Sequence, residues 1–249
     1  MAGTDLKGKI IFITGASSGI GAVLAEMLIA RGAKVVGAAR NLDKLETMAT
    51  RFGSNFLPWK LDVTDGPAVS ALPRQLPEGW QDVSALINNA GHDTGGRERL
   101  DDCQPDELAR IIEVNVVGMI RVARAFAPHF LQRGSGDIVN VGSTSGHFAI
   151  AHDAAYVSSK FAISGLTRAL RADYEGCGIR IIEVSPGVAR TGFAQARYHD
   201  DESKAVSFYE RFPAVLEADD VARAIIFALE QPSHVAIGEL LMFPVHGPS

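Results

Sequence analysis

The sequence predicts an α/β protein, a single-domain Rossmann-type fold over residues 1–249 with a doubly wound parallel sheet and helices on both faces. Three observations predict it. Short apolar runs rich in β-branched residues alternate with helix-length amphipathic segments along the whole chain. Gly15, Asn88 and Gly142 stand at or just after the ends of three of these runs, as at the functional edge of a parallel sheet. No internal repeat, low-complexity tract or linker divides the chain.

The first predicted strand, residues 9–13, runs into a glycine-rich turn, and a helix is predicted over 22–31. Glycines between a strand and a helix allow a tight bend and let a phosphate approach the amides of the helix N-terminus. The turn therefore predicts a dinucleotide site, although a purely structural turn is the alternative. The predicted contacts are Gly15, Ser17, Ser18, Gly19, Ile20 and Gly21.

A second strand is predicted over residues 33–39 and is followed by Arg40. In dinucleotide folds the end of this strand meets the adenosine ribose, where an acidic residue binds the 2′-hydroxyl. Here Ala39 is neutral and Arg40 is cationic, which favours the 2′-phosphate of NADP over NAD. A solvated surface arginine is the alternative interpretation.

The remaining elements follow the same alternation. In chain order, helices are predicted over 41–52, 69–76 (interrupted by Pro73), 105–131, 154–174 and 218–230, and strands over 56–60, 83–87, 138–141, 179–184 and 239–243.

Polar and small residues after three of these strands are candidate cofactor contacts. Asp62 could accept from an adenine amino group, but a carboxylate at this point could equally cap the helix that begins near Asp65. Small residues after the fourth strand would let a nucleoside pass close to the backbone. The further predicted contacts are Val63, Asn89, Ala90, Gly91, Pro186, Gly187, Val188 and Thr191.

The segment from Gly142 to Lys160 carries the candidate chemistry. Tyr156 and Lys160 are four residues apart, so in a helix their side chains lie on one face. Ser143 stands at the end of the preceding strand. A hydroxyl, a phenol and an ammonium could therefore converge, although a Tyr–Lys pair alone is common at protein surfaces.

Two further segments show irregular patterns. Asn115 lies inside the predicted helix 105–131, where asparagine is a poor helix former, and this indicates either a local distortion or a tolerated polar residue. Residues 188–214 are irregular and rich in aromatic side chains. This second segment could be a substrate lid of short helices or a packed aromatic cluster.

Composition excludes several classes of protein. Hydrophobic residues make up 47% of the chain, charged residues 21%, and the net charge is −5. The chain has no basic run, membrane-length apolar run or apolar N-terminal segment, so we expect no nucleic-acid or membrane partner and a cytoplasmic protein. Neither the two cysteines nor the pair His147 and His152 has convincing metal-ligand spacing, so no metal is expected.

Taken together, these motifs resemble the short-chain dehydrogenase/reductase family over nearly the whole chain. The matching elements, in the family's order, are T-G-A-S-S-G-I-G at 14–21, N-N-A-G at 88–91, Asn115, Ser143, Y-x-x-x-K at 156–160 and P-G at 186–187.

The resemblance implies a role for each catalytic residue. Tyr156 would be the general acid and base. Lys160 would lower the pKa of Tyr156 and also hold the nicotinamide ribose. Ser143 would donate a hydrogen bond to the substrate oxygen, and Asn115 would hold a water that links Lys160 to solvent. The family also commonly assembles as tetramers through the helices that carry Asn115 and Tyr156, so a homotetramer or homodimer is expected.

Three stretches of the chain, at 76–91, 220–237 and 239–245, are similar to those of a narrower branch. This branch comprises the NADP-dependent serine and 3-hydroxy acid dehydrogenases and the clavulanate dehydrogenase-like enzymes. The loops at 92–96 and 189–193 differ from the serine enzymes, so this likeness does not fix the substrate. Arg190 or Arg97 could meet a substrate carboxylate from these loops. The predicted substrate contacts are Ser143, Ser145, His147, Tyr156 and Phe193, with Phe148, His152 and Gly187 as further pocket candidates.

The resulting expectation is an NADP(H)-dependent oxidoreductase that interconverts a secondary alcohol or hydroxy acid and its carbonyl, with a small-molecule substrate. A reductase of neutral aryl or alkyl ketones or aldehydes is the alternative. A dehydratase or epimerase on the same fold usually has a larger C-terminal substrate region than this chain. A non-catalytic NADP-binding regulator often lacks the Tyr or the Lys, and this chain has both.

Overall fold

A single parallel seven-stranded sheet forms the centre of the protein in the computed structural model, which describes residues 4–94, 98–198 and 201–245. The strand order is β3-β2-β1-β4-β5-β6-β9. The order reverses between β1 and β4, so a crevice opens beyond the carboxyl ends of these two strands. The strands are β1 (Ile10–Thr14), β2 (Lys34–Ala39), β3 (Phe56–Lys60), β4 (Val83–Asn88), β5 (Gly136–Val141), β6 (Ile179–Pro186) and β9 (Glu239–Met242).

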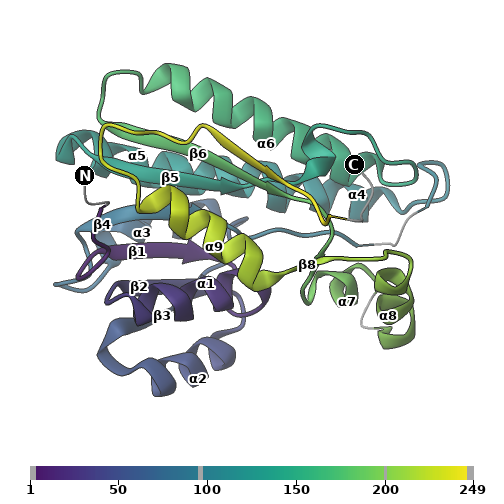
Figure 1. Ribbon diagram of the computed structural model, residues 1–249, viewed down its shortest axis with the longest axis horizontal. Coiled ribbons are helices and arrows are strands. Elements are labelled where there is room, and N and C mark those ends of the chain that lie inside the picture. The colour runs from purple at the N-terminus through teal and green to yellow at the C-terminus, as the bar shows by residue number, and fades with distance from the viewer. Residues whose placement is uncertain (1–3, 95–97, 199–200, 246–249) are drawn as a thin grey trace.

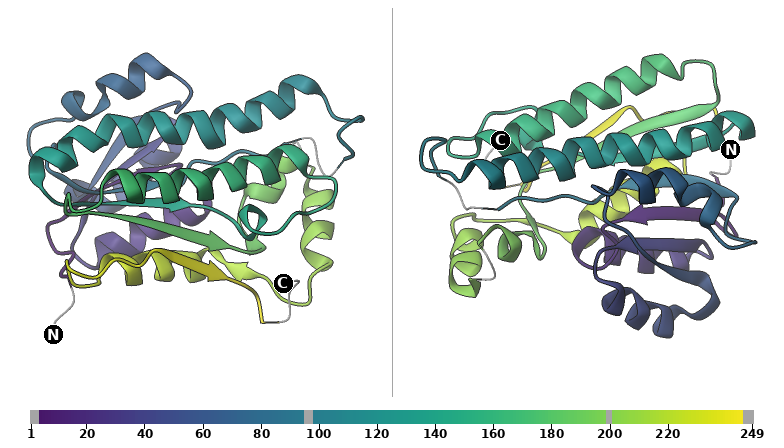
Figure 2. Two further views of the ribbon diagram at one scale, coloured as in Figure 1. Left: turned by 90° about the horizontal axis from the view of Figure 1, so that it is seen from above. Right: turned by 180° about the vertical axis from the view of Figure 1, so that it is seen from behind.

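Helices cover both faces of the sheet, which confirms the predicted fold class (Figures 1 and 2). Helices α1, α2 and α9 pack on one face, and α3, α5 and α6 lie on the other. The helices are α1 (Gly19–Ala30), α2 (Leu42–Phe52), α3 (Gly66–Gln75), α4 (Pro105–Ile112), α5 (Met119–Arg133), α6 (Ala154–Asp173), α7 (Phe193–Arg197), α8 (Glu202–Glu210) and α9 (Ala218–Leu229), with short helices at Gly53–Asn55, Glu113–Gly118 and Thr144–Gly146.

Two apolar cores hold the sheet between its helices. All five residues of β1 are buried; Ile11 and Ile13 belong to the core under α1 and α9, whereas Phe12 belongs to the core under α3 and α5. This alternation follows from the two-residue period of a strand. The Phe12 ring lies 4.9 Å from the ring of Phe126 on α5, and burial of such a side chain stabilises the fold by roughly 1.5–3 kcal/mol.

Two predicted helices differ from the structure. Helix α3 runs through Pro73 without interruption, because this proline lies in the last turn and the helix ends at Gln75. The predicted helix 105–131 is divided into α4, a π-helix over Glu113–Gly118 and α5. Asn115 lies inside the π-helix, so a local distortion does occur where the asparagine indicated one.

The segment between β6 and α9 forms a small layer of its own beyond the carboxyl ends of the strands (Figure 1). A two-stranded sheet of β7 (Ala189–Arg190) and β8 (Leu216–Glu217) joins the two ends of this segment. Between them, α7 and α8 pack around a satellite core that contains Phe208 and Tyr209. In the described part of the chain, no helix has the length and apolar character needed to span a membrane.

Candidate active site

A single cavity of about 950 Å³ runs along the carboxyl ends of the strands, under α7. It joins most of the predicted cofactor residues to the predicted catalytic residues. The predicted residues that line it are Gly15, Ser17, Ser18, Gly19, Ile20, Arg40, Asp62, Val63, Asn89, Ala90, Gly91, Ser143, Tyr156, Lys160, Pro186, Gly187, Thr191 and Phe193.

Gly21 lies behind the cavity wall and has a packing role. A Cβ on Gly21 would stand 2.4 Å from the carbonyl oxygen of Gly15 and 2.7 Å from Asn89 Nδ2. The Thr14 hydroxyl accepts from the backbone N–H groups of Asn89 and Ala90, each at 3.0 Å. The glycine turn after β1 and the loop after β4 are therefore locked together, and α1 begins directly behind them.

At one end of the cavity, Arg40 lies exposed, and Ser17 and Ser18 line the same cavity. Asp62 also lines this end, and its carboxylate accepts from the backbone N–H and the hydroxyl of Thr64. Burial alone would raise the pKa of Asp62, but the Thr64 hydrogen bonds and the nearby Arg110 and Arg40 lower it. Asp65, not Asp62, caps α3 by accepting from the Ala68 N–H. Asp62 lines the cavity, and its Oδ2 lies 3.5 Å from Arg110 Nη2.

At the opposite end of the cavity, Tyr156 and Lys160 lie on one face of α6, with Ser143 at the end of β5. The Tyr156 phenol shares a hydrogen bond with the Ser143 side chain. Lys160 Nζ lies 5.6 Å from the centroid of the Tyr156 ring and donates to the Val141 carbonyl at 3.1 Å. The hydroxyl, phenol and ammonium therefore do converge in the structure.

Burial shifts the pKa values of both catalytic groups toward their neutral forms. It raises the pKa of Tyr156 well above its usual value, against a lowering influence of the Arg197 cation and the Ser143 hydrogen bond. It lowers the pKa of Lys160 to about 8, and the negative charges of Glu183 and Asp93 oppose this decrease. A tyrosine in this site consequently needs nearby positive charge before it can act as a base.

Asn115 is fully buried and connects three segments around the site. Its Oδ1 accepts from the His92 N–H at 2.6 Å, and its Nδ2 donates to the His92 carbonyl at 2.9 Å and to Ser159 Oγ at 3.0 Å. Ser159 Oγ donates in turn to the Tyr156 carbonyl at 2.7 Å. The π-helix thus places the Asn115 amide between the loop after β4 and α6.

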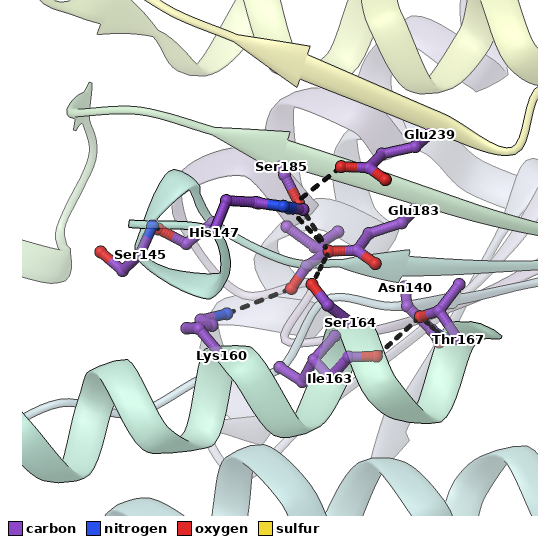
Figure 3. Close-up of polar contacts among 12 residues, drawn as sticks. Asn140, Ser145, His147, Lys160, Ile163, Ser164, Thr167, Glu183, Ser185 and Glu239 are labelled. Atoms are coloured by element: carbon purple, nitrogen blue, oxygen red, sulfur yellow. Dashed lines mark hydrogen bonds and ion pairs between the residues drawn. The ribbon is translucent and has the colours of Figure 1, made fainter. Parts of the chain in front are cut away.

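Ser145 and His147 do not reach the cavity. Ser145 is buried, and its backbone N–H donates to Ser143 Oγ. The His147 side chain is directed away from the cavity toward Glu239 Oε1 at 3.0 Å and Glu183 Oε1 at 3.6 Å (Figure 3). Because Ser164 and Ser185 also donate to Glu183, His147 belongs to a polar cluster between α6, β6 and β9. The substrate contact expected of these two residues has no geometric support here.

Other pocket candidates also lie elsewhere. Phe148 is largely exposed and packs against Phe243, and His152 is exposed with a positive φ of 61°. Arg190 pairs with Glu217 across the small sheet, at 3.3 Å from Nε to Oε1. Arg97 lies outside the described residues. Val188 is likewise outside the cavity lining, where its carbonyl accepts from the Leu216 N–H.

The sequence reasoning missed a buried ionic cluster beside Tyr156. Arg197 on α7 pairs with Asp93, which follows β4, and with Asp153 at the start of α6. All three side chains are at least nine-tenths buried. Since Asp93 and Arg197 are 104 positions apart, no local sequence pattern signals this cluster. The only charged residue in the sequence F-A-Q-A-R of α7 is Arg197.

The lining of the cavity fits a dinucleotide along its length. The N-terminus of α1 and the adjoining glycine turn offer backbone N–H groups to a pyrophosphate. Asp62 offers an acceptor to an adenine amino group, and Lys160 offers a donor to ribose hydroxyls. Arg40, Ser17 and Ser18 together suit a phosphate on the adenosine ribose.

Comparison with known proteins agrees with this geometry. The family model described as short chain dehydrogenase matches residues 9–202. An NADP-dependent 3-hydroxy acid dehydrogenase of Schizosaccharomyces pombe is 38% identical over 246 residues, which cover 97% of this chain and 94% of the relative. The corresponding Escherichia coli K12 enzyme is 31% identical over 237 residues, covering 95% of each chain.

Among solved structures, the closed form of a serine dehydrogenase complexed with NADP⁺ superposes with a TM-score of 0.93 at 30% identity, over 96% of each chain. The Escherichia coli serine dehydrogenase superposes with a TM-score of 0.84 at 27% identity, over 96% of this chain and 100% of the other. The family model covers most of the chain, and the catalytic side chains stand together as its motifs predict. The chain belongs to the short-chain dehydrogenase family.

Proposed function

We propose that this protein is an NADP(H)-dependent oxidoreductase that interconverts a secondary alcohol, in the first instance a 3-hydroxy acid, and its carbonyl. One observation carries the proposal. Tyr156, Ser143 and Lys160 meet at one end of a cavity that presents Arg40 at its other end. The relatives that span nearly the whole chain include NADP-dependent 3-hydroxy acid dehydrogenases.

The catalytic side chains have complementary roles in this reaction. Bound NADP(H) supplies or accepts the hydride. Tyr156 donates a proton to the carbonyl oxygen in reduction and accepts the hydroxyl proton in oxidation. Ser143, which already shares a hydrogen bond with the phenol, donates to the same substrate oxygen and stabilises negative charge there. The Lys160 ammonium favours the phenolate form of Tyr156.

Arg40 supports the use of NADP rather than NAD. It follows β2, the strand whose end meets the adenosine ribose in this fold. Arg40 is exposed, and it lines the same cavity as Ser17 and Ser18. A ribose 2′-phosphate at this position would receive charge-assisted hydrogen bonds, whereas a 2′-hydroxyl would not.

Residues 188–214 act as the substrate lid in this proposal. The small sheet of β7 and β8 holds both ends of the segment, and α7 covers the catalytic end of the cavity. The Phe193 ring lies 5.6 Å from the Tyr156 ring, at the boundary of that cavity. A substrate held under Phe193 would be shielded from water during hydride transfer.

A neutral ketone or aldehyde is a second candidate substrate, because the catalytic end of the cavity is largely apolar. Val141, Ala189, Phe193 and Ala196 line it. Within the described lining, the cationic side chains are Arg40, Lys60 and Lys160, and Arg190 is paired with Glu217. Since Arg40 lies at the opposite end, a substrate carboxylate would have no lining arginine beside it at the catalytic end, within the described residues.

A cofactor-coupled absorbance screen separates the two candidates. Purified protein is supplied with NADPH or NADH and a set of 3-oxo acids, their methyl esters and neutral aryl or alkyl ketones, and the reverse reaction is tested with the corresponding alcohols. Faster NADPH oxidation with the acids than with the esters supports the 3-hydroxy acid class. Turnover of only the neutral carbonyls supports the second candidate, and no turnover of any member contradicts the proposed reaction class.

We further assign the protein to the cytoplasm and to a homodimer or homotetramer. Both cysteines, Cys103 and Cys177, are free thiols, as in reducing compartments. On α6, the small residues Ala154, Ala155, Ser158 and Ala162 leave a surface that a second copy could approach closely. Sedimentation analysis across a range of concentrations tests the assembly, and a monomer at every concentration would contradict it.

A further inference from the structure

Arg197 is a buried cation packed against the catalytic tyrosine, and the proposed reaction does not use it. Only 4% of its surface is exposed. Its guanidinium lies 5.7 Å from the centroid of the Tyr156 ring, 5.6 Å from that of Phe193 and 5.3 Å from that of Phe208. A cation surrounded by three aromatic faces in a desolvated position interacts strongly with them.

Two carboxylates from different loops hold this guanidinium in place. Asp93 follows β4, and its Oδ2 accepts from Arg197 Nε at 2.5 Å. Asp153 is the N-cap residue of α6, yet its Oδ2 accepts from Arg197 Nη2 at 3.2 Å rather than capping the helix. Removing one side chain from such a buried ionic group leaves an uncompensated buried charge, which strongly destabilises the folded protein.

These contacts fix α7, which is too short to be stable alone. The helix has five residues, far fewer than an isolated helix needs in water. Phe193 and Arg197 are four positions apart, so both lie on the helix face that packs on Tyr156. The ionic cluster and the ring contacts therefore seat this part of the lid directly on the catalytic side chain.

We propose that Arg197 is a positioning residue, which seats α7 on Tyr156 through Asp93 and Asp153 and places a positive charge beside the phenol. The inference rests on the proposed function, because it assigns to the lid a part in the acid–base step. The lid and Tyr156 then act as one unit: Tyr156 receives its second nearby cation only while α7 is seated.

The charges that face Tyr156 come from three elements. Lys160 approaches from α6 itself, Arg197 from α7, Asp93 from the loop after β4 and Asp153 from the start of α6. Ser143 adds its hydrogen bond from the end of β5. Of these groups, Lys160 and Arg197 favour the phenolate, whereas both aspartates oppose it.

Arg197 does not have the geometry of a substrate-binding arginine. It is not among the residues that line the cavity, since Phe193 and Ala196 of the same helix occupy that wall. Two carboxylates already bind its guanidinium. A substrate carboxylate would have to displace one of them from a buried position.

The pH profile of alcohol oxidation at saturating NADP tests the charge beside the phenol. Oxidation requires the phenolate, so loss of the Arg197 cation moves the acidic limb of kcat/KM to higher pH. In Arg197→Met we expect the apparent pKa of this limb to rise by about one unit or more. At a fixed pH below the limb, kcat/KM should then be lower than in the parent by about tenfold for each unit of that rise. Arg197→Lys retains the positive charge, so its acidic limb should lie close to that of the parent protein. Arg190→Met, which removes an exposed lid arginine, leaves the limb in place.

Asp153→Asn separates the electrostatic effect from a purely structural one. It keeps the Asp93 ion pair and removes one negative charge facing Tyr156, so the limb moves to lower pH. If both variants shift the limb in the same direction while α7 stays seated in Asp153→Asn, as judged by hydrogen exchange, or if neither variant shifts it, the proposal is wrong. A rise in KM confined to carboxylate substrates, with an unchanged limb, would make Arg197 a substrate-binding residue and overturn the proposal.

Hydrogen exchange tests the seating of α7 without any turnover. The amides of Phe193–Arg197 should exchange about tenfold faster or more in Arg197→Met than in the parent, while those of α9 keep their rates. Unchanged exchange in α7 would contradict the seating. Because turnover of the parent protein is measured first in the pH experiment, a failure of the proposed reaction is seen there and is distinct from a failure of this inference.

Discussion

At the residue scale, burial favours the neutral forms of Tyr156 and Lys160, and nearby charged side chains oppose this effect. Burial raises the pKa of Tyr156 and lowers that of Lys160 to about 8. Their convergence with Ser143 was predictable, because a strand end and an i, i+4 helix pair are local patterns. The cluster of Arg197, Asp93 and Asp153 was not predictable, because these residues are far apart in the sequence and meet only in the folded protein.

Arg40 is the residue on which the cofactor preference depends. In Arg40→Asp, a charge-assisted interaction with a 2′-phosphate, worth about 1.5–3 kcal/mol, is replaced by repulsion. We expect the ratio of kcat/KM for NADPH to that for NADH to fall by about tenfold to a hundredfold or more. Arg74→Asp makes the same charge change on α3, outside the cavity lining, and should leave the ratio unaltered. An unchanged ratio in Arg40→Asp would show that Arg40 does not determine the preference for NADPH.

At the element scale, the order and type of most helices and strands followed from periodicity, but their interruptions depended on tertiary contacts. The asparagine at 115 indicated a distortion, yet a π-helix is explained only by the buried partners of that side chain on His92 and Ser159. The paired strands β7 and β8 were not predicted, because two-residue strands carry no periodic signal.

Helix α1 owes its position to a glycine that is not part of the cavity lining. In Gly21→Ala, the added Cβ would meet the Gly15 carbonyl oxygen at 2.4 Å, so the helix must move away from the turn. We expect the Kd for NADPH, measured by titration of its fluorescence, to rise at least about tenfold. Gly165→Ala on α6 is the matched control, because its Cβ meets nothing within 4 Å. It should keep the parent Kd; equal affinity in both variants would refute the packing role of Gly21.

At the scale of the whole molecule, one parallel sheet with its strand-order reversal determines where all the functional loops meet. The apolar runs predicted this architecture, because buried parallel strands must be continuous and apolar. The same architecture buries Lys160 between α6 and the end of β5, where an uncompensated charge lowers the free energy of unfolding. Stability of the cofactor-free protein should therefore depend on pH through this side chain.

Lys160 should make the cofactor-free protein more stable at alkaline pH. Its pKa is about 8 in the folded state and near 10.5 in the unfolded state. Below pH 8 both states hold the proton, so the cost of the buried charge is constant and fully present. Between these values the unfolded state holds a proton that the folded state has released, so stability rises with pH.

Urea unfolding of the parent and of Lys160→Met measures this effect. The difference between their free energies of unfolding should change in favour of the parent by up to about 3 kcal/mol from pH 8 to pH 10.5. The comparison removes the other groups that titrate in this range, because both proteins share them. A constant difference across the range would mean that Lys160 keeps its usual pKa in the folded protein.

The most direct test of the central claim is the turnover rate of Tyr156→Phe with NADPH and the best carbonyl substrate. We expect kcat to fall by about 10²–10⁴-fold while the Kd for NADPH changes little, because the lost group is the hydroxyl that donates the proton. Tyr174→Phe makes the same substitution at the far end of α6 and should retain the parent kcat. A near-normal rate in Tyr156→Phe would contradict the account, because the proton would then have to come from another group.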